Sequence, residues 1–215
     1  QFQVWFVAVL LVGLISGCGT LNNALVDKTK TVEYYRIFDI KTSAARKVVA
    51  QAASNGLGKN VGNSQEATPI PSSAELSDKP GRFKLVNPFE GSKFAALAGG
   101  SMKVATCDGA VWTAKANRKV TGSNNLNLTA CIFQYKDGYQ LDVYAVFTKK
   151  EGGIMQLSRS MANAMVGTPE EWTEKTFLDI VKSIREETSA EVAYLEGEPE
   201  LSGTPWLDQG ASIKQ

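Results

Sequence analysis

The side chains that could do chemistry are few, because the 215-residue sequence contains no histidine. This absence excludes Ser-His-Asp and Cys-His catalysis and every zinc site that uses histidine. Four aspartates fall on expected strands and turns, namely Asp39, Asp108, Asp137 and Asp142. Their spacing does not guarantee a carboxylate pair, and Asp108 and Asp137 each precede a glycine, as turn residues do. We therefore expect no catalytic residue, no cofactor and no metal site.

Two further patterns raise the question of anion binding. The glycine pairs at 99–100 and 152–153 lack the motif and the strand-to-helix setting of a phosphate loop, so we interpret them as hinges or caps. Basic residues near expected strand ends could form one basic rim: Arg118, Lys119, Lys149 and Lys150. A solvated edge that discourages strand addition is the simpler interpretation.

The charges are unevenly distributed along the chain. The formal net charge is +1, which gives no reason to expect nucleic acid as a partner. Residues 18–168 carry 19 Lys and Arg against 11 Asp and Glu, whereas residues 169–200 carry 3 against 10. The two parts should attract each other. They indicate either solvated faces of opposite sign or an acidic surface that docks a basic partner.

The first residues are typical of a signal peptide. No charge occurs before residue 16, and the apolar run 4–15 is too short to span a bilayer comfortably. The run ends in Ile15-Ser16-Gly17-Cys18, which resembles the lipobox of bacterial lipoproteins. Small residues let the chain lie extended in a peptidase cleft, and the cysteine thiol accepts a diacylglycerol group before cleavage. The alternative is an ordinary transmembrane anchor with an incidental cysteine.

The resemblance implies where the protein resides. Residues 1–17 would be removed, Cys18 would carry palmitate-type acyl chains, and about 0.8 kcal/mol per buried methylene would hold the protein on a membrane. Gly19 stands where an aspartate would favour retention in the inner membrane. The expected location is therefore the periplasmic face of the outer membrane, with the outer leaflet of the inner membrane as the alternative.

The same resemblance bears on the other two cysteines, Cys107 and Cys131. An exported protein meets an oxidising compartment, in which a pair of thiols normally forms a disulfide. We expect these cysteines to be bridged. A redox-active pair is the weaker alternative, because the two residues lack the Cys-x-x-Cys spacing.

The elements that must position these residues begin after a lipid-anchored tether at 18–31. Aromatic and β-branched residues at 32–40 predict a strand. Thr42 or Ser43 could cap a helix whose apolar residues recur at three- and four-residue spacings up to Ala53. Gly56 is expected to end this helix in a left-handed conformation.

The middle of the chain predicts a sheet. A Pro-punctuated loop spans 58–81, with at most an edge strand at 67–70, and a short strand is possible at 82–86. Residues 94–98 could form a helical turn or a mobile flap. Four strand-like runs follow, at 102–106, 110–119, 126–135 and 139–148, with a hairpin turn at Lys136-Asp137-Gly138. Both faces of this hairpin are largely apolar, which predicts cover on both sides or a face open to a ligand.

The last third predicts helices and a tail. Residues 154–165 have helical spacing, and Thr168, Pro169 and Glu171 form a capping-box start for a second helix with a buried stripe through Phe177 and Ile184. A strand is expected at 191–195. Residues 197–215 read as a flexible tail, in which Trp206 and Leu207 could dock on the parent domain or on a partner.

These expectations combine into one α+β domain at 32–196, with a mostly antiparallel sheet of about five to six strands, an early helix and a long C-terminal helix packed on it. The leading functional hypothesis is a non-catalytic interaction or scaffolding module of a cell-envelope assembly, with a membrane and an envelope protein as partners. The alternative is a carrier or sensor of an apolar or amphiphilic ligand held between sheet and helix. Carboxylate, lysine or Ser-Lys chemistry remains a third possibility.

Overall fold

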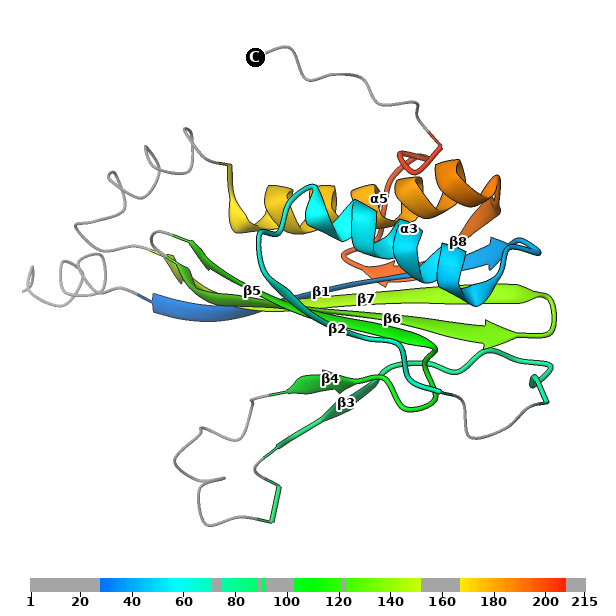
Figure 1. The fold of residues 1–215 in the computed structure, drawn as a ribbon. Helices are drawn as coiled ribbons and strands as arrows, with labels where there is room; N and C mark the ends of the chain where they lie inside the picture. The colour runs from blue at the N-terminus through cyan, green and yellow to red at the C-terminus, as the bar shows by residue number, and fades with distance from the viewer. Residues whose placement is uncertain are drawn as a thin grey trace, which may run out of the picture.

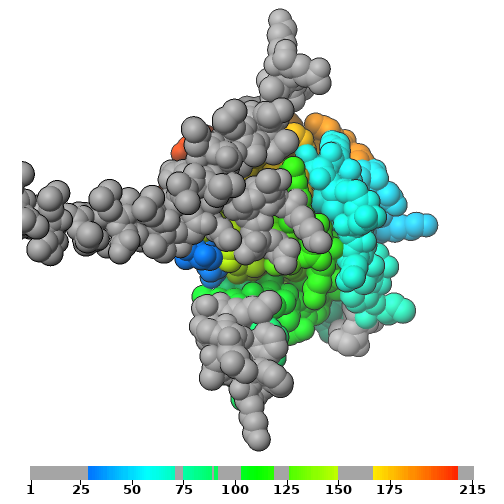
Figure 2. All heavy atoms as spheres, turned by 90° about the vertical axis from the view of Figure 1, so that its left-hand side faces the viewer, coloured from blue at the N-terminus to red at the C-terminus, as the bar shows by residue number. Residues whose placement is uncertain are grey.

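The predicted α+β class is confirmed by the computed structural model, which describes residues 28–70, 75–88, 90–91, 103–120, 123–151 and 167–207. A six-stranded antiparallel sheet carries two helices, α3 and α5, on one of its faces (Figure 1). Figure 2, viewed from the end at which β1 begins, shows the cyan α3 and the orange α5 on the same side of the sheet. We refer to this side as the helix face and to the other as the second face.

The strand order in the main sheet is β2-β5-β6-β7-β1-β8. Its strands are β1 (Lys28–Lys41), β2 (Ser64–Ala67), β5 (Trp112–Val120), β6 (Ser123–Tyr135), β7 (Gly138–Glu151) and β8 (Glu191–Glu198). A separate two-stranded sheet pairs β3 (Lys84–Val86) with β4 (Val104–Thr106). The predicted hairpin is present, since β6 and β7 pair through Tyr135 and Gly138 around the turn.

Two domain boundaries differ from those expected. Strand β1 begins at Lys28, inside the expected tether, because it pairs with β7 as far as Glu151. At the other end β8 continues through Glu198, because Gly197 and Glu198 still pair with β1. The folded part therefore extends beyond 32–196 on both sides. The expected signal peptide, most of the tether, the segments at 94–98 and 154–165 and the last residues of the tail lie outside the described residues.

Helix α5 (Pro169–Thr188) begins as the sequence predicts. The Thr168 side chain accepts a hydrogen bond from the Glu171 N–H, and the Glu171 carboxylate accepts one from the Thr168 N–H. Pro169 occupies the first turn, where no amide donor is needed. The expected stripe is buried, with Phe177 and Ile184 among its fully buried members.

Helix α3 (Arg46–Gly58) departs from the prediction at both ends. Its N-cap is Ala45, which makes no side-chain capping bond. The Thr42 hydroxyl instead accepts the Ala44 N–H and donates to the Thr188 carbonyl, so it ties the entry of α3 to the end of α5. Gly56 lies inside the helix rather than ending it in a left-handed conformation, and the C-cap is Lys59.

The layer between the sheet and the two helices is filled by apolar side chains. Its fully buried members come from both helices and from the central strands: Phe38, Ile40, Val49, Leu57, Leu128, Ile132, Leu141, Phe147, Phe177 and Ile180. Because alternate strand residues point to opposite faces, the second face carries another set that includes Cys131, Phe133 and Tyr144. Phe83 covers this face, packing on Tyr144 and Tyr35.

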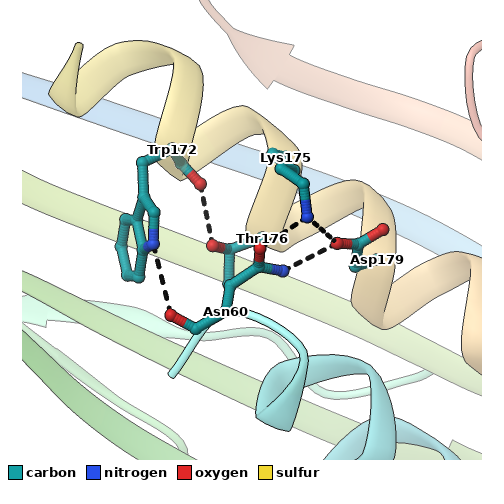
Figure 3. A network of polar contacts seen from close by, with 5 residues as sticks. All are labelled: Asn60, Trp172, Lys175, Thr176 and Asp179. Atoms are coloured by element: carbon teal, nitrogen blue, oxygen red, sulfur yellow. Dashed lines mark hydrogen bonds and ion pairs between the residues drawn. The ribbon is translucent and has the colours of Figure 1, made fainter. Parts of the chain in front are cut away.

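A polar network fixes the end of α3 to α5 (Figure 3). Trp172 Nε1 donates to the Asn60 carbonyl at 3.3 Å, and Asn60 Nδ2 donates to Asp179 Oδ2 at 2.7 Å. Lys175 Nζ bridges Asn60 Oδ1 and Asp179 Oδ2 at 2.6 and 2.7 Å. Burial alone would raise the pKa of Asp179, but the hydrogen bonds from Lys175 and Asn60 outweigh it and lower that pKa. The network therefore holds two helices together around an ionised carboxylate.

Candidate binding groove

An open groove of about 690 Å³ lies between the first turns of α3 and the β2 margin of the sheet. Its lining combines polar and apolar groups: Arg46, Lys47, Ala50, Gln51, Ser54, Glu66, Ala67, Thr68, Trp112 and Gln134. The floor is apolar, since Ala50 and Trp112 are buried beneath it. Among the described residues, this arrangement is the best candidate for binding another molecule.

Arg46 and Lys47 supply the positive charge of the groove. Arg46 Nε donates to Gln134 Oε1 at 3.0 Å, which fixes the guanidinium at the junction of α3 and β6. Lys47 is exposed on the next position of the helix. The first turn of α3 contains no acidic residue that would balance these cations. Neither cation has a carboxylate partner within the part of the chain that the structure describes.

Glu66 is the acidic residue of the groove, and both of its carboxylate oxygens already accept hydrogen bonds. Oε1 accepts from the Ser64 hydroxyl at 2.7 Å, and Oε2 accepts from Trp112 Nε1 at 3.2 Å. The Trp112 bond satisfies the indole N–H of a buried side chain. These bonds hold Glu66 on its own strand and on the groove floor, and Glu66 forms no ion pair with Arg46 or Lys47 in the described residues.

Strand β2 forms one wall of the groove and one margin of the main sheet. It pairs with β5 from Ser64–Ala116 to Ala67–Thr113, and all four of its residues are exposed. No other described strand pairs with its outer side. Half of the N–H and C=O groups of such a margin point outward and can pair with an added strand.

The groove and the start of β1 lie at opposite ends of the molecule. Strand β1 runs from Lys28 to Lys41 and leads directly into α3, whose first residues line the groove. A strand of 14 residues spans about 43 Å at ~3.3 Å per residue. Figure 1 shows β1 beginning at the left of the sheet and α3 beginning at the right. Lys28, the first residue that the structure describes, is therefore far from the groove.

The predicted cysteine bridge is present. Cys107 and Cys131 form a disulfide whose Cα atoms are 5.7 Å apart. The bond joins β6 to the segment that follows β4, and therefore fastens the small sheet to the second face. Cys18, the expected lipidation residue, lies outside the described residues.

Trp206 docks on its own domain. Its ring lies against Phe38 and Tyr194, with centroid distances of 5.8 and 5.5 Å, and its Nε1 donates to the Val192 carbonyl. Of the two expectations for Trp206, the structure shows the intramolecular one. Leu207 follows it and remains exposed, while its carbonyl accepts a bond from Arg185 Nη1 at 3.4 Å. The chain is thus packed through Leu207, well past the expected start of the tail.

Asp39 belongs to a polar cluster at the hairpin end of the sheet. Tyr135 donates its hydroxyl hydrogen to Asp39 Oδ1 at 2.5 Å, and Lys41 donates to the Tyr135 hydroxyl and pairs with Asp39. Burial and the Asp39 contact raise the pKa of Tyr135, and the Tyr135 contact raises the pKa of Lys41. Both groups thus hold their protons more tightly, which is the opposite of what a general base requires.

Asp142 lies fully buried on the second face and is the most perturbed carboxyl group described. Its oxygens accept hydrogen bonds from the Phe83 N–H at 2.9 Å and from Gln140 Nε2 at 2.8 Å. Gln140 also donates to the Gly81 carbonyl. Burial raises the pKa of Asp142 to about 6 despite these bonds. Asp142 therefore fastens residues 81–83 across the sheet. Asp108 and Asp137 lie in turns, as predicted.

The residues of the expected basic rim share one end of the sheet, at the start of β1. Lys149 is opposite Lys30 on β1 and opposite Ser123 on β6, and Arg118 is opposite Leu126. Their side chains turn to α5, since Lys149 binds Glu170 at 3.0 Å and Arg118 lies 5.0 Å from the Trp172 ring. These contacts join the basic part of the chain to its acidic helix. Lys119 lies on β5, and Lys150 on β7 is opposite Thr29 of β1.

The groove has no signature in the sequence that would predict it as a site. Arg46, Lys47, Glu66 and Gln134 are separated by as many as 88 positions, and only the pairing of β2, β5 and β6 beneath α3 brings them together. The available signal was local: two consecutive basic residues at the start of a predicted helix, where acidic residues are favoured.

No family model matches the chain, and no curated protein matches it. Among solved structures, the chain is similar to a conserved protein from Geobacillus kaustophilus at 10% sequence identity and a TM-score of 0.30. That match covers 74% of this chain and 98% of the other. A likeness this weak assigns no function. Within the described residues, no helix has the length and apolar character needed to cross a membrane.

Proposed function

We propose that this chain is a lipid-anchored, non-catalytic interaction module of the cell envelope, held through Cys18 on the periplasmic face of the outer membrane. The observation that carries the proposal is the apolar leader that ends in Ile15-Ser16-Gly17-Cys18. The Cys107–Cys131 disulfide supports export, because disulfides persist in oxidising compartments. The outer leaflet of the inner membrane is the alternative location.

The groove supports a binding role within that location. It offers two cations, two amides, one carboxylate and an apolar floor, all carried by α3 and by the margin of the main sheet. It also lies at the far end of β1 from the residues that would carry the lipid. We therefore assign the groove to an envelope protein partner, and the strands near Lys28 to the membrane side.

Metabolic labelling tests the anchor. Host cells that express the full chain are grown with an alkyne analogue of palmitate, and the purified protein is examined by in-gel detection and intact-mass measurement. The wild-type chain should carry the label and begin at Cys18, whereas Cys18→Ser should retain its leader and remain unlabelled. Cys107→Ala/Cys131→Ala is the control and should label normally. A native protein with an uncleaved leader and no acyl group would overturn the proposal.

A second candidate, carriage of an amphiphilic ligand, is favoured by one observation. The groove volume of about 690 Å³ lies within the range of roughly 300–1,000 Å³ found for small-molecule sites. The space between helices and sheet is filled by packed side chains, so such a ligand would occupy the groove. Native mass spectrometry of protein from its own host should then show a bound mass, and a clean mass would count against carriage.

A further inference from the structure

We propose that the groove docks an extended, acidic segment of the partner protein, which pairs with the outer side of β2 and places its carboxylates against Arg46 and Lys47. This inference rests on the proposed function as an interaction module, and it specifies the chemistry of the partner. It has three supports: the charge of the groove, its shape and its place on the molecule.

The charge argument compares these cations with the other basic residues. Seven described basic residues form an ion pair with a carboxylate of this chain, whereas other described basic residues form none: the pairs are Arg36 with Glu174, Lys41 with Asp39, Arg82 with Glu196, Lys103 with Glu33, Lys136 with Asp78, Lys149 with Glu170 and Lys175 with Asp179. Arg46 and Lys47 have no such match in the described ranges, and the one acid nearby, Glu66, is engaged by Ser64 and Trp112. What distinguishes Arg46 and Lys47 is that they lie side by side on the wall of a groove, where a bound carboxylate could accept charge-assisted hydrogen bonds from both.

The shape argument favours a polypeptide over a small ligand. Small ligands are usually enclosed over most of their surface, whereas this groove is open to solvent. One of its walls includes Glu66 and Ala67 of β2, and the outer backbone groups of this strand can add a further strand. Strand addition supplies affinity through main-chain hydrogen bonds, and neighbouring pockets or charges supply specificity.

The position argument separates a protein from a lipid surface. Cys18 precedes Lys28 by ten residues, which reach at most about 36 Å even when fully extended, whereas β1 spans about 43 Å before the chain reaches the groove. The anionic surface of the protein's own membrane therefore lies at the wrong end. An acidic segment of another envelope protein meets no such restriction.

Site-specific photo-crosslinking in host cells tests the inference on the full, acylated chain. A photoreactive amino acid replaces Gln51, which lines the groove but carries no charge. Tandem mass spectrometry should identify a crosslinked segment with two or more Asp or Glu residues. Arg46→Glu/Lys47→Glu should reduce the crosslink about tenfold, as the loss of roughly 1.4 kcal/mol of binding free energy would.

Lys115→Glu is the matched control. Lys115 is exposed on β5 but alternates with the buried Ala114 and Ala116, so it faces away from α3. This variant should crosslink as the wild type does.

Arg46→Gln/Lys47→Gln removes charge without reversing it, and it should give an intermediate loss with an unchanged melting temperature. Lysines in place of the partner's acidic residues should restore the crosslink to the Glu variant.

The remaining outcomes would contradict the inference. A crosslinked segment without acidic residues, or one insensitive to the charge of residues 46 and 47, would overturn the inference and leave the interaction module in place. A small bound molecule that blocks the Gln51 crosslink would overturn it in favour of ligand carriage. The absence of crosslinks from Gln51 and also from a second probe at Lys115, in an acylated chain, would overturn both the inference and the interaction module.

Discussion

Asp142 shows how one buried side chain can make the stability of this domain depend on pH. Its carboxyl group is fully buried on β7 and accepts hydrogen bonds from the Phe83 N–H and from Gln140. Burial disfavours the ionised form and raises the pKa from 3.8 to about 6. Arg82, which lowers the pKa, and Glu196, which raises it, are the other charges nearby.

Replacement of Asp142 by Asn should remove this pH dependence. The folded state binds a proton at a higher pH than the unfolded state does, so the free energy of unfolding should rise as pH falls from about 7 to 4. The gain is roughly 2–3 kcal/mol, at 1.36 kcal/mol per pKa unit. Urea unfolding at several pH values should show this gain in the wild type and its loss in Asp142→Asn.

The control for this experiment is Asp108→Asn, which changes an exposed carboxyl group in a turn. Its profile should run parallel to that of the wild type. If Asp142→Asn kept the wild-type slope, burial of Asp142 would not be the source of the pH dependence.

The contact between α3 and α5 depends on the absence of a side chain at Gly56. A Cβ atom at this position would lie 2.6 Å from the Ile180 Cα and would overlap the Asp179 carbonyl. The helices therefore approach each other at backbone distance at Gly56 and Asp179. Asp179 also belongs to the polar network with Asn60 that Figure 3 shows. Any side chain here forces the two helices apart.

Alanine at two glycines of α3 should have opposite effects. Gly56→Ala should lower the free energy of unfolding by about 1–3 kcal/mol through overpacking. Gly58→Ala adds a Cβ that would meet nothing within 4 Å. It should raise the free energy of unfolding by about 0.4–1 kcal/mol, because alanine lowers the conformational entropy of the unfolded chain. Chemical unfolding of both variants checks the pair. Equal effects of one sign would contradict the close helix contact.

The segment after β8 offers another matched pair. Trp206→Ala should cost about 3 kcal/mol, because it empties the space against Phe38 and Tyr194. Leu207→Ala, at a side chain 42% exposed, should change the free energy of unfolding by less than about 0.5 kcal/mol. Calorimetry of the two variants would reveal the difference. Similar melting temperatures would mean that residues 199–207 do not support the domain.

The sequence predicted those elements whose signals are local. The start of α5 is an example, since Thr168, Pro169 and Glu171 contain all of its capping chemistry. The start of α3 was predicted wrongly because the Thr42 hydroxyl is engaged by Thr188, 146 positions away. Gly56 was taken for a helix end because its close neighbour, Asp179, belongs to another helix. The groove was missed for the same reason: its residues meet only after the sheet has formed.

At the scale of the whole molecule, the segment that covers the second face is attached to the main sheet at two points. One is the Cys107–Cys131 bond, and the other is the set of hydrogen bonds from residues 81–83 to Gln140 and Asp142. The small sheet of β3 and β4 lies between these two attachment points in the chain. Loss of either attachment should let the segment that contains β3 and β4 open before the main sheet unfolds.

Removal of the disulfide tests whether this bond stabilises the domain and the segment that contains β3 and β4. Cys107→Ala/Cys131→Ala should lower the free energy of unfolding by about 3 kcal/mol, the loop-closure value for cysteines that are 24 positions apart. Hydrogen exchange should quicken at 103–111 and leave α3 and α5 protected. The wild type under reducing conditions should lose the same free energy. An unchanged midpoint of unfolding would exclude a stabilising role for the bond.

The pairing of β1 on both of its sides has a mechanical consequence. Strand β1 lies between β7 and β8, and its inter-strand hydrogen bonds run perpendicular to the chain. A tensile force that is applied at Lys28 and opposed at the groove acts along β1. It loads the inter-strand hydrogen bonds together in shear rather than one after another. The domain is thus built to withstand traction between its two ends, as an anchored link in a chain of proteins would need to be.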